Sequence, residues 1–336
     1  MNKIAKTVLM TGTALCAAGV VLSTAGYFAG GKDFTYTSDH MYVSGGNSSS
    51  RKNLTVMKKE QIDDFTKLNV DFENFDLDIR TSDDDHYYME YKLEKNGRKN
   101  PLTWKDKDGE LTLEESAGGS GSYYITYDLG IFSTHADLTE KKDALNTVIL
   151  YIPEKAQLSE AELQLSDGDL TADQLLCKEM TLELLNGDLM LDKGEFEKFD
   201  AKFSDGDLNV KELQCTDNMQ LKSGNGDVTI KKAELADGQI ALSDGDLQID
   251  NSSFNGDMKI NSSCGDVSVE MKNGSAEKTN IYLKAADGDV DTEGLSRGKS
   301  DNEEDTSVYE NKAGASAPTL NVKCSDGDIT LTESEK

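Results

Sequence analysis

The sequence is poor in the residues from which most active sites are built. It has three histidines, His40, His86 and His135, and all of them precede the repeats described below. It contains no HExxH, P-loop, GxSxG or dinucleotide-binding motif. From Leu158 onward the only arginine is Arg297, although sites that bind acidic sugars need basic groups. We therefore expect a protein that is not an enzyme, with a carbohydrate-active β-helix enzyme as a lower alternative.

Basic side chains are also scarce relative to acidic ones. The 336 residues include 35 Lys and Arg against 63 Asp and Glu, which gives a formal net charge of −28. Such a surface repels nucleic acids and anionic lipid headgroups, so we expect no nucleic-acid partner. It suits a soluble extracellular module, or one that meets cations or basic partners.

What the chain does have is a ten-residue phrase that returns through its C-terminal half. It first reads LQLSDGDLTA from Leu163, and successive copies are 19 to 23 residues apart until the last interval of 39. That last interval is close to two periods with one phrase missing. A fixed period of this size predicts a stacked repeat architecture. The Gly-Asp pairs begin at Gly168, Gly187, Gly206, Gly226, Gly245, Gly265, Gly288 and Gly327.

Each phrase has the pattern of a strand, a corner and a second strand. Apolar residues alternate with polar ones on both sides of the glycine, which is typical of strands with one buried face. Leu170, Leu189, Leu208 and Leu247, for example, all stand two positions after the glycine. The residue before the glycine is Asp or Asn in all copies except Cys264, and Asn-Gly and Asp-Gly favour tight reversals.

Two all-β architectures fit this pattern, namely an antiparallel meander of hairpins and a β-solenoid in which each period is one coil. We favour the solenoid, of stacked 19–20-residue coils, because a meander of about sixteen strands would need closing or splitting. The off-phase phrase Asn255-Gly256-Asp257 predicts a second corner in at least one coil.

An aspartate follows every repeat glycine, and the alternation places this column on the outside. Neighbouring carboxylates about 5 Å apart in water would repel by roughly 0.8 kcal/mol. One interpretation is an edge that binds cations, most plausibly Ca²⁺. The favoured interpretation is that each carboxylate accepts backbone N–H groups at its corner, because no known calcium-binding repeat or EF-hand loop is present. No cofactor is expected, with Ca²⁺ as the open alternative. The metal candidates are Asp169, Asp188, Asp207, Asp227, Asp246 and Asp266.

The cysteines do not predict a disulfide framework. Cys177 and Cys215 both stand nine positions after a repeat glycine, in a column that also holds Phe196. They would lie two coils apart, near 9.5 Å at a strand spacing of about 4.8 Å, which is too far for a disulfide. Cys324 also occupies an inward position. We expect free, buried thiols that bind no metal.

The N-terminus predicts a membrane segment. Residues 7–30 contain no charged side chain, and Lys3 and Lys6 precede them. A helix of this length spans about 36 Å, enough to cross a bilayer. The lysines predict a cytoplasmic N-terminal stub at 1–6 and an extracellular body. A cleaved signal peptide is the alternative, because Ser23-Thr24-Ala25 resembles a cleavage site.

The remainder of the chain divides into three parts. Residues 31–60 include GGNSSSRKN and predict a flexible stalk. Residues 61–155 alternate like strands without the Gly-Asp corner, and we expect them to form the N-terminal β part and cap. Residues 156–336 form the predicted solenoid, with an exposed polar loop at 293–317 replacing most of one coil.

Three stretches resemble a known family. They are IDDFTKLNVDFENFDLDIR from Ile62, TVILYIPEKAQL from Thr147, and the SDGDL and NGDL repeats that follow. Together they resemble the bacterial adhesin-like β-repeat proteins known as DUF4097, which include membrane-anchored proteins of the LiaG type found near cell-envelope stress systems. The resemblance implies a β-solenoid-like extracytoplasmic domain without known catalysis, and it brings no functional residues.

These observations predict a single-pass membrane protein of a Gram-positive-type bacterium that presents an acidic β-solenoid outside the cell. Its expected role is that of an envelope-associated scaffold or adhesion module, with an accessory role in envelope-stress sensing as a further hypothesis. Its expected partner is a cell-envelope component or a membrane protein. A Ca²⁺-dependent surface module is the alternative.

Overall fold

A computed structural model describes residues 34–36, 41–43, 54–117, 145–292, 295, 298–303 and 306–334. Apart from one 3₁₀ turn, η2 (Ala276–Lys278), the regular elements among these residues are β-strands. The chain divides into two units. In the first, the structure describes one antiparallel pair, β1 (Phe34–Tyr36) and β2 (Met41–Val43). The second unit, called the repeat body below, begins at residue 55 and contains the other strands.

The predicted membrane segment lies outside the described residues. Within the described ranges, no helix has the length and hydrophobicity needed to cross a bilayer. Part of the predicted stalk at 31–60 is described, and there the expectation needs correction. Strand β3 (Leu54–Ile62) already begins inside it, because Met57 packs against the core and Ile62 is buried.

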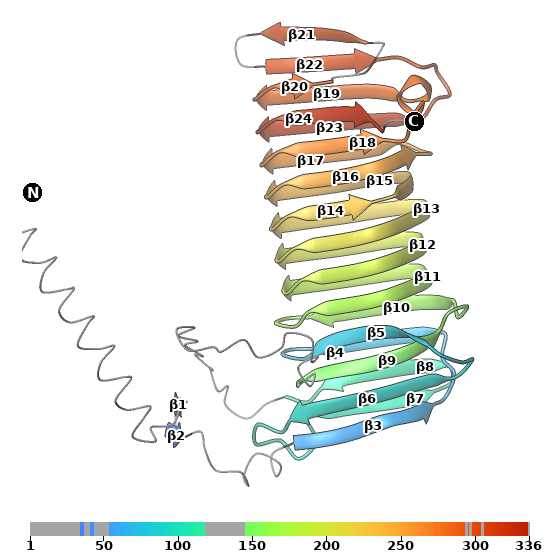
Figure 1. The fold of residues 1–336 in the computed structure, drawn as a ribbon, viewed down its shortest axis with the longest axis vertical. Coiled ribbons are helices and arrows are strands. Elements are labelled where there is room, and N and C mark those ends of the chain that lie inside the picture. The colour runs from blue at the N-terminus through green and yellow to red at the C-terminus, as the bar shows by residue number, and fades with distance from the viewer. Residues whose placement is uncertain are drawn as a thin grey trace, which may run out of the picture. The chain divides into compact units, whose positions relative to one another are not determined.

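The repeat body is one continuous sheet of 22 strands wound into coils, which stack like rungs (Figure 1). Its N-terminal strands after β3 are β4 (Lys67–Phe72), β5 (Asp76–Ser82), β6 (Tyr87–Glu94), β7 (Leu102–Lys107), β8 (Glu110–Glu115) and β9 (Thr147–Pro153). The central strands are β10 (Leu158–Leu165), β11 (Leu170–Asn186), β12 (Leu189–Asp205), β13 (Leu208–Asn225), β14 (Val228–Lys231), β15 (Ala233–Asp244), β16 (Leu247–Phe254), β17 (Met258–Cys264) and β18 (Val267–Met271). The C-terminal strands are β19 (Asn280–Asp287), β20 (Val290–Asp291), β21 (Lys299–Glu303), β22 (Thr306–Asn311), β23 (Thr319–Asp326) and β24 (Ile329–Glu333).

Parallel pairing between residues one period apart establishes the solenoid. Leu170 pairs with Leu189, and Leu189 pairs with Leu208, in parallel registers that continue through β11, β12 and β13. A meander of hairpins would have paired these strands antiparallel. The stacked coils predicted from the 19–20-residue period are therefore confirmed.

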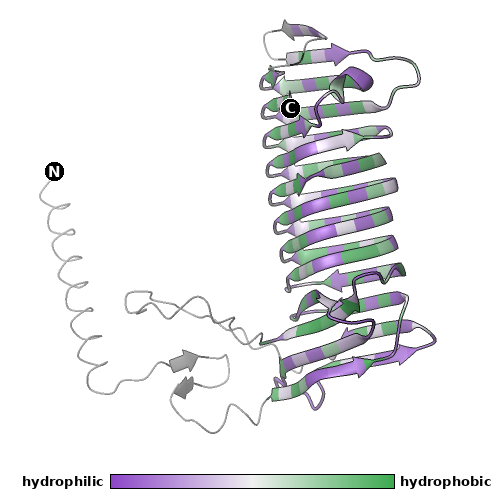
Figure 2. Ribbon diagram, turned by 45° about the vertical axis from the view of Figure 1, so that its right-hand side comes forward, coloured by the Kyte–Doolittle hydropathy of each residue, from purple (hydrophilic) through white to green (hydrophobic). Residues whose placement is uncertain are grey.

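The core consists of continuous columns of apolar side chains. Leu189, Leu208 and Leu247 are at most 2% exposed and lie in the same column. Leu163, Leu182 and their equivalents form another column that is buried along the whole stack. Apolar and polar residues alternate along each rung (Figure 2). Since each coil buries only one side of its strands, the coils are stable only as a stack.

The order of the coils in space differs from their order in the sequence at the C-terminal end. Strand β23 lies between β17 and β19, and β24 lies between β18 and β20. The last coil of the chain is thus inserted between two earlier ones (Figure 1). The interval of 39 residues between Gly288 and Gly327 does not mark a missing phrase, because the coil at Gly327 stacks directly on that at Gly265.

Within 293–317, which we expected to be an exposed loop, the structure has two strands. β21 pairs antiparallel with β22, and β22 pairs antiparallel with β19 beyond the inserted coil. Ser307, Tyr309 and Asn311 are buried, so this hairpin covers the open apolar end of the stack. The prediction failed because the outward side of the hairpin is polar and its inward side carries few apolar residues.

A similar insertion occurs at the N-terminal end. Strand β4 pairs in parallel with both β8 and β10, and β5 pairs in parallel with both β9 and β11. Beyond them, β6 and β7 pair antiparallel with β9 and β8. Both ends of the parallel stack are therefore bounded by antiparallel strands, which interrupt the repeat.

Candidate functional site

The repeat glycines form an edge of the body at which consecutive backbones touch. Gly206 has a φ of +133°, and a Cβ atom placed on it would lie 2.1 Å from the carbonyl oxygen of Gly187. Gly226 meets Gly206 in the same way, at 2.1 Å. From Gly206 onward the column needs glycine both for its positive φ and for this close approach, whereas Gly168 and Gly187 need it for the close approach alone. Among the described residues, no residue directly before a repeat glycine has a positive φ.

The aspartate column is a ladder of hydrogen bonds. The Oδ1 atom of Asp169 accepts the backbone N–H of Asp188 at 2.9 Å, and the Oδ1 atom of Asp207 accepts that of Asp227 at 2.9 Å. The ladder runs in spatial order through the inserted coil, so Asp266 accepts from Asp328 at 2.9 Å. The complete column is Asp76, Asp169, Asp188, Asp207, Asp227, Asp246, Asp266, Asp328 and Asp289. The structure therefore brings all six candidate metal ligands onto one edge, each holding the next coil.

This bonding explains why like charges can stack. A hydrogen bond to a charged group contributes about 1.5–3 kcal/mol, which exceeds the roughly 0.8 kcal/mol of repulsion between neighbours in water. The expectation that the carboxylate accepts a backbone N–H is confirmed for the repeat aspartates from Asp169 to Asp266 and for Asp328, although the donor lies on the adjacent coil rather than in the same corner.

One member of the ladder was not anticipated. Asp76 accepts the backbone N–H of Asp169 at 3.0 Å and so extends the column into the N-terminal part. Burial is the main reason that the pKa of the Asp76 carboxyl is raised. The phrase FDLDIR resembles the second half of a repeat phrase, since its Leu77 occupies the position of Leu170. Because no glycine precedes Asp76, the sequence analysis did not recognise this corner.

Two further side-chain hydrogen bonds lie beside the ladder and join residues that precede the repeat glycines. The Asn186 amide donates to the Asp167 carboxylate at 2.7 Å, and the Asn225 amide donates to the Asp205 carboxylate at 2.6 Å. Alternation of Asp and Asn replaces carboxylate–carboxylate contacts by amide–carboxylate hydrogen bonds. The sequence shows this alternation, and its physical role becomes apparent from the structure.

The off-phase phrase forms the predicted second corner. The backbone N–H of Asp257 donates to the Oδ1 atom of Asp237 at 2.6 Å, and that of Thr319 donates to Asp257 at 2.9 Å. The same inter-coil capping is thus used at a different corner of the coil.

The outward side chains are tied together by ion pairs between coils. Lys198 contacts Glu179 at 2.8 Å, and Lys232 contacts Glu212 at 2.6 Å. Each pair is largely exposed, so each contributes little to stability on its own. These lysines nevertheless neutralise part of the acidic surface along the stack.

The cysteines lie where the repeat predicts them. Cys177 pairs with Phe196, and Phe196 pairs with Cys215, so the two thiols are two coils apart. Cys177, Cys215 and Cys324 are free and buried, whereas Cys264 is free and exposed. Burial raises the pKa of the Cys177 thiol to about 12 and that of Cys215 to about 11. Thiols of this kind are poor nucleophiles and poor metal ligands.

The described residues contain no group of three or more His, Cys, Asp or Glu side chains arranged to hold a metal ion. His86 is described and lies 3.5 Å from Asp84 on the exposed surface. His40 and His135 lie outside the described residues.

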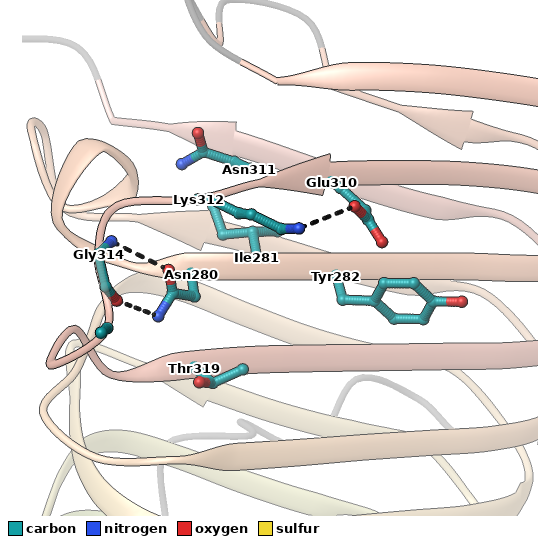
Figure 3. Close-up of a pocket in the computed structure, with 9 residues that line it drawn as sticks. Asn280, Ile281, Tyr282, Glu310, Asn311, Lys312, Gly314 and Thr319 are labelled. Atoms are coloured by element: carbon teal, nitrogen blue, oxygen red, sulfur yellow. Dashed lines mark hydrogen bonds and ion pairs between the residues drawn. The ribbon is translucent and has the colours of Figure 1, made fainter.

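A hollow of about 420 Å³ lies at the C-terminal end of the body (Figure 3). Tyr282, Glu310 and Thr319 line it together with the connection from β22 to β23, and Lys312 pairs with Glu310 at 3.9 Å. Glu310 and Lys312 are the charged side chains of this lining, and both are largely exposed.

Comparison with known proteins identifies the family. The family model described as Toastrack DUF4097 matches residues 65–332. The chain belongs to the Toastrack family. The family resemblance seen in the sequence is thereby confirmed. No curated protein matches the chain.

Several solved structures resemble the Toastrack body at low identity. One, described as a "putative adhesin" from Parabacteroides merdae, is 17% identical, with a TM-score of 0.46, and the match covers 86% of this chain and 98% of that one. Another of that description, from Parabacteroides distasonis, is 16% identical, with a TM-score of 0.43 and coverages of 84% and 97%. A third, described as a "putative lipid binding protein" from Parabacteroides distasonis, is 12% identical, with a TM-score of 0.41 and coverages of 86% and 98%.

Proposed function

We propose that this Toastrack protein is a non-enzymatic scaffold or adhesion module, held outside the bacterial membrane by residues 7–30. The supporting observation is the aspartate ladder. The carboxylates of the aspartate column accept backbone N–H groups of adjacent coils. These hydrogen bonds hold the coils together in a stiff stack. A stack of this kind is suited to presenting a surface at a distance from its anchor.

The anchor is supported by charge. Residues 7–30 contain no charged side chain, and Lys3 and Lys6 stand before them. Short lysine-bearing ends remain in the cytoplasm, which leaves the repeat body outside. Retention of this segment, rather than its cleavage as a signal peptide, is part of the proposal.

The surface supports a partner in the cell envelope. With a net charge of −28 the chain is a poor ligand for nucleic acids. Outward lysines such as Lys198 and Lys232 form ion pairs with Glu179 and Glu212. We propose a cell-envelope component or a membrane protein as the partner, and an accessory role in envelope-stress sensing.

The topology can be tested through Cys264, the exposed thiol among the four described cysteines. Intact Gram-positive cells that express the full chain would be treated with a membrane-impermeant maleimide. Labelling of the native chain, and its loss in Cys264→Ser, is the expected result. Labelling that appears only after lysis would reject an extracellular body. Release of a shortened chain into the medium would show that residues 7–30 are cleaved.

The partner can be found with a photo-crosslinker at Met190 of β12, whose side chain is 53% exposed. The matched control places it at Leu191, which is buried. Adducts with an envelope component from Met190 alone support the scaffold role, and an absence of adducts argues against it. Soluble products in a glycan-degradation screen would reject the non-enzymatic assignment.

A further inference from the structure

The inserted C-terminal coil occupies a slot formed entirely by earlier parts of the chain. One wall of the slot is β17 and β18, and the other is β19 and β20. The other wall forms a small sheet of its own, because β19 also pairs with β22 of the terminal hairpin, and its strand pairing to the rest of the stack runs through β23 and β24. Figure 1 shows β23 and β24, with the C-terminus, between these neighbours.

The segment is bonded to both walls in the same way as a coil in the middle of the stack. On one side, the backbone N–H of Val267 donates to the Asp328 carbonyl at 2.9 Å. On the other side, the backbone N–H of Ile329 donates to the Asp289 carbonyl at 2.8 Å. Its inward side chains are completely or almost completely buried, namely Leu320, Val322, Cys324, Ile329 and Leu331.

The corner of the slot restricts what can enter it. The Asp328 backbone N–H donates to Asp266, and the Asp328 carboxylate accepts the N–H of Asp289 at 2.8 Å. A Cβ atom on Gly327 would lie 2.5 Å from the carbonyl oxygen of Gly265. The slot therefore selects an extended segment with alternating apolar residues and a Gly-Asp corner.

The connection to this segment is exposed and lightly held. Residues 312–316 are exposed. The connection borders the hollow of Figure 3, where the Asn280 side chain donates to the carbonyls of Gly314 at 2.9 Å and Ala317 at 3.0 Å and accepts the backbone N–H groups of Ala313 and Gly314. One side chain thus anchors the tether, whereas the segment itself is bonded and buried along its whole length between the two walls.

We propose that this slot is a strand-binding site whose ligand is residues 319–334 of the chain itself, a separable segment that binds without its covalent tether. Because residues 319–334 follow both walls of the slot in the sequence, they are synthesised after the strands between which they lie. Its specificity comes from the alternating apolar side chains and from the glycine at the corner.

The test uses the full chain, with the recognition sequence of a specific protease inserted after Gly314 or, in a second version, after Ser316. Thermal melting of the uncut proteins shows which version is folded. After cleavage of the folded protein, the C-terminal fragment is expected to remain with the body during gel filtration. A fluorescent peptide of residues 317–336, added in excess and warmed with the cut protein, is expected to replace it.

Two matched peptides decide specificity. A peptide with Gly327→Val is expected to lose retention, because its side chain would overlap the Gly265 carbonyl. A peptide with Lys323→Ala, changed at an exposed outward position, is expected to be retained like the native one. Release of the fragment on cleavage, failure of the native peptide to exchange, or equal retention of the Gly327→Val peptide would each overturn the proposal.

Discussion

The backbone N–H of Asp207 donates a 2.9 Å hydrogen bond to the Oδ1 atom of Asp188, which stands nineteen residues earlier in the chain. The two residues lie on adjacent coils, and the bond runs along the stack axis. The same contact recurs from coil to coil, so the acidic edge acts as a seam between coils. Its stability rests on an acceptor atom at each position.

This predicts that the acceptor matters more than the charge. We expect Asp207→Asn to change the free energy of unfolding by no more than about 0.5 kcal/mol, because an amide oxygen can still accept the N–H of Asp227. Asp207→Ala removes the acceptor and should cost about 1–2 kcal/mol. Urea unfolding of both variants measures this. Equal losses in the two variants would show that the charge itself is required.

The buried column predicts a large penalty for a charge. Leu208 is 1% exposed, so Leu208→Asp places an unpaired carboxylate in the core and should destabilise by about 4 kcal/mol or more. Asn209→Asp, at the exposed neighbouring position, is the control and should change stability by less than about 0.5 kcal/mol. Chemical denaturation distinguishes them, and similar unfolding midpoints for both variants would contradict the stacked core.

The glycine corner predicts a steric penalty beyond its backbone conformation. Gly206→Val meets both the positive φ and the Gly187 carbonyl at 2.1 Å. Gly274 has a φ of +75° with open space around its Cβ position, so Gly274→Val should cost only about 1–2 kcal/mol. Gly206→Val should lower the melting midpoint substantially more. A comparable shift for the two variants would mean that the coils can separate at the corner.

For the cation alternative, we expect no effect of Ca²⁺ on stability. One oxygen of each of the six candidate carboxylates, from Asp169 to Asp266, already accepts a backbone N–H. Melting curves recorded with millimolar Ca²⁺ and with a chelator should share one midpoint. A midpoint that rises with Ca²⁺ would instead follow from preferential binding to the folded state and would support a Ca²⁺-dependent module.

The buried thiols predict a loss of stability in alkali. Cys177 has an ordinary thiol pKa of 9.0 when unfolded and about 12 when folded. Between these values the unfolded state loses a proton that the folded state keeps, so its contribution to stability is complete below pH 9 and falls as the pH rises toward 12. Urea midpoints at about pH 8 and about pH 10.5 measure the fall. It should be smaller in Cys177→Ala, and an equal fall would exclude this thiol as a cause.

The middle of the fold was predictable because each coil repeats the same alternation of buried apolar and exposed polar residues. Leu170, Leu189 and Leu208 occupy equivalent positions in the sequence and one column in the structure. The role of Asp207 was also predictable, since an outward Asp after a corner glycine has few other functions. Its donor was not, because the pattern does not reveal whether the partner lies in the same corner or on the next coil.

The two ends of the stack were not predictable from the period. An interval of 39 residues between Gly288 and Gly327 is compatible with a missing phrase and with a coil inserted elsewhere. A coil can pair in parallel with any other coil of equal length, so the order in the sequence does not fix the order in the stack. The hairpin β21–β22 escaped notice since only one of its faces is covered. Asp76 was missed because its corner lacks glycine.

The insertion of the last coil has a consequence for how such proteins change length. The C-terminal residues leave the body from between two coils, so units appended to the chain end would have no face on which to stack. Growth or shortening must happen in the interior, between Gly168 and Gly265, where one whole period can be duplicated or removed while both tips stay intact. Adding or removing a period there would change the length of the repeat body without altering the segments that close its ends.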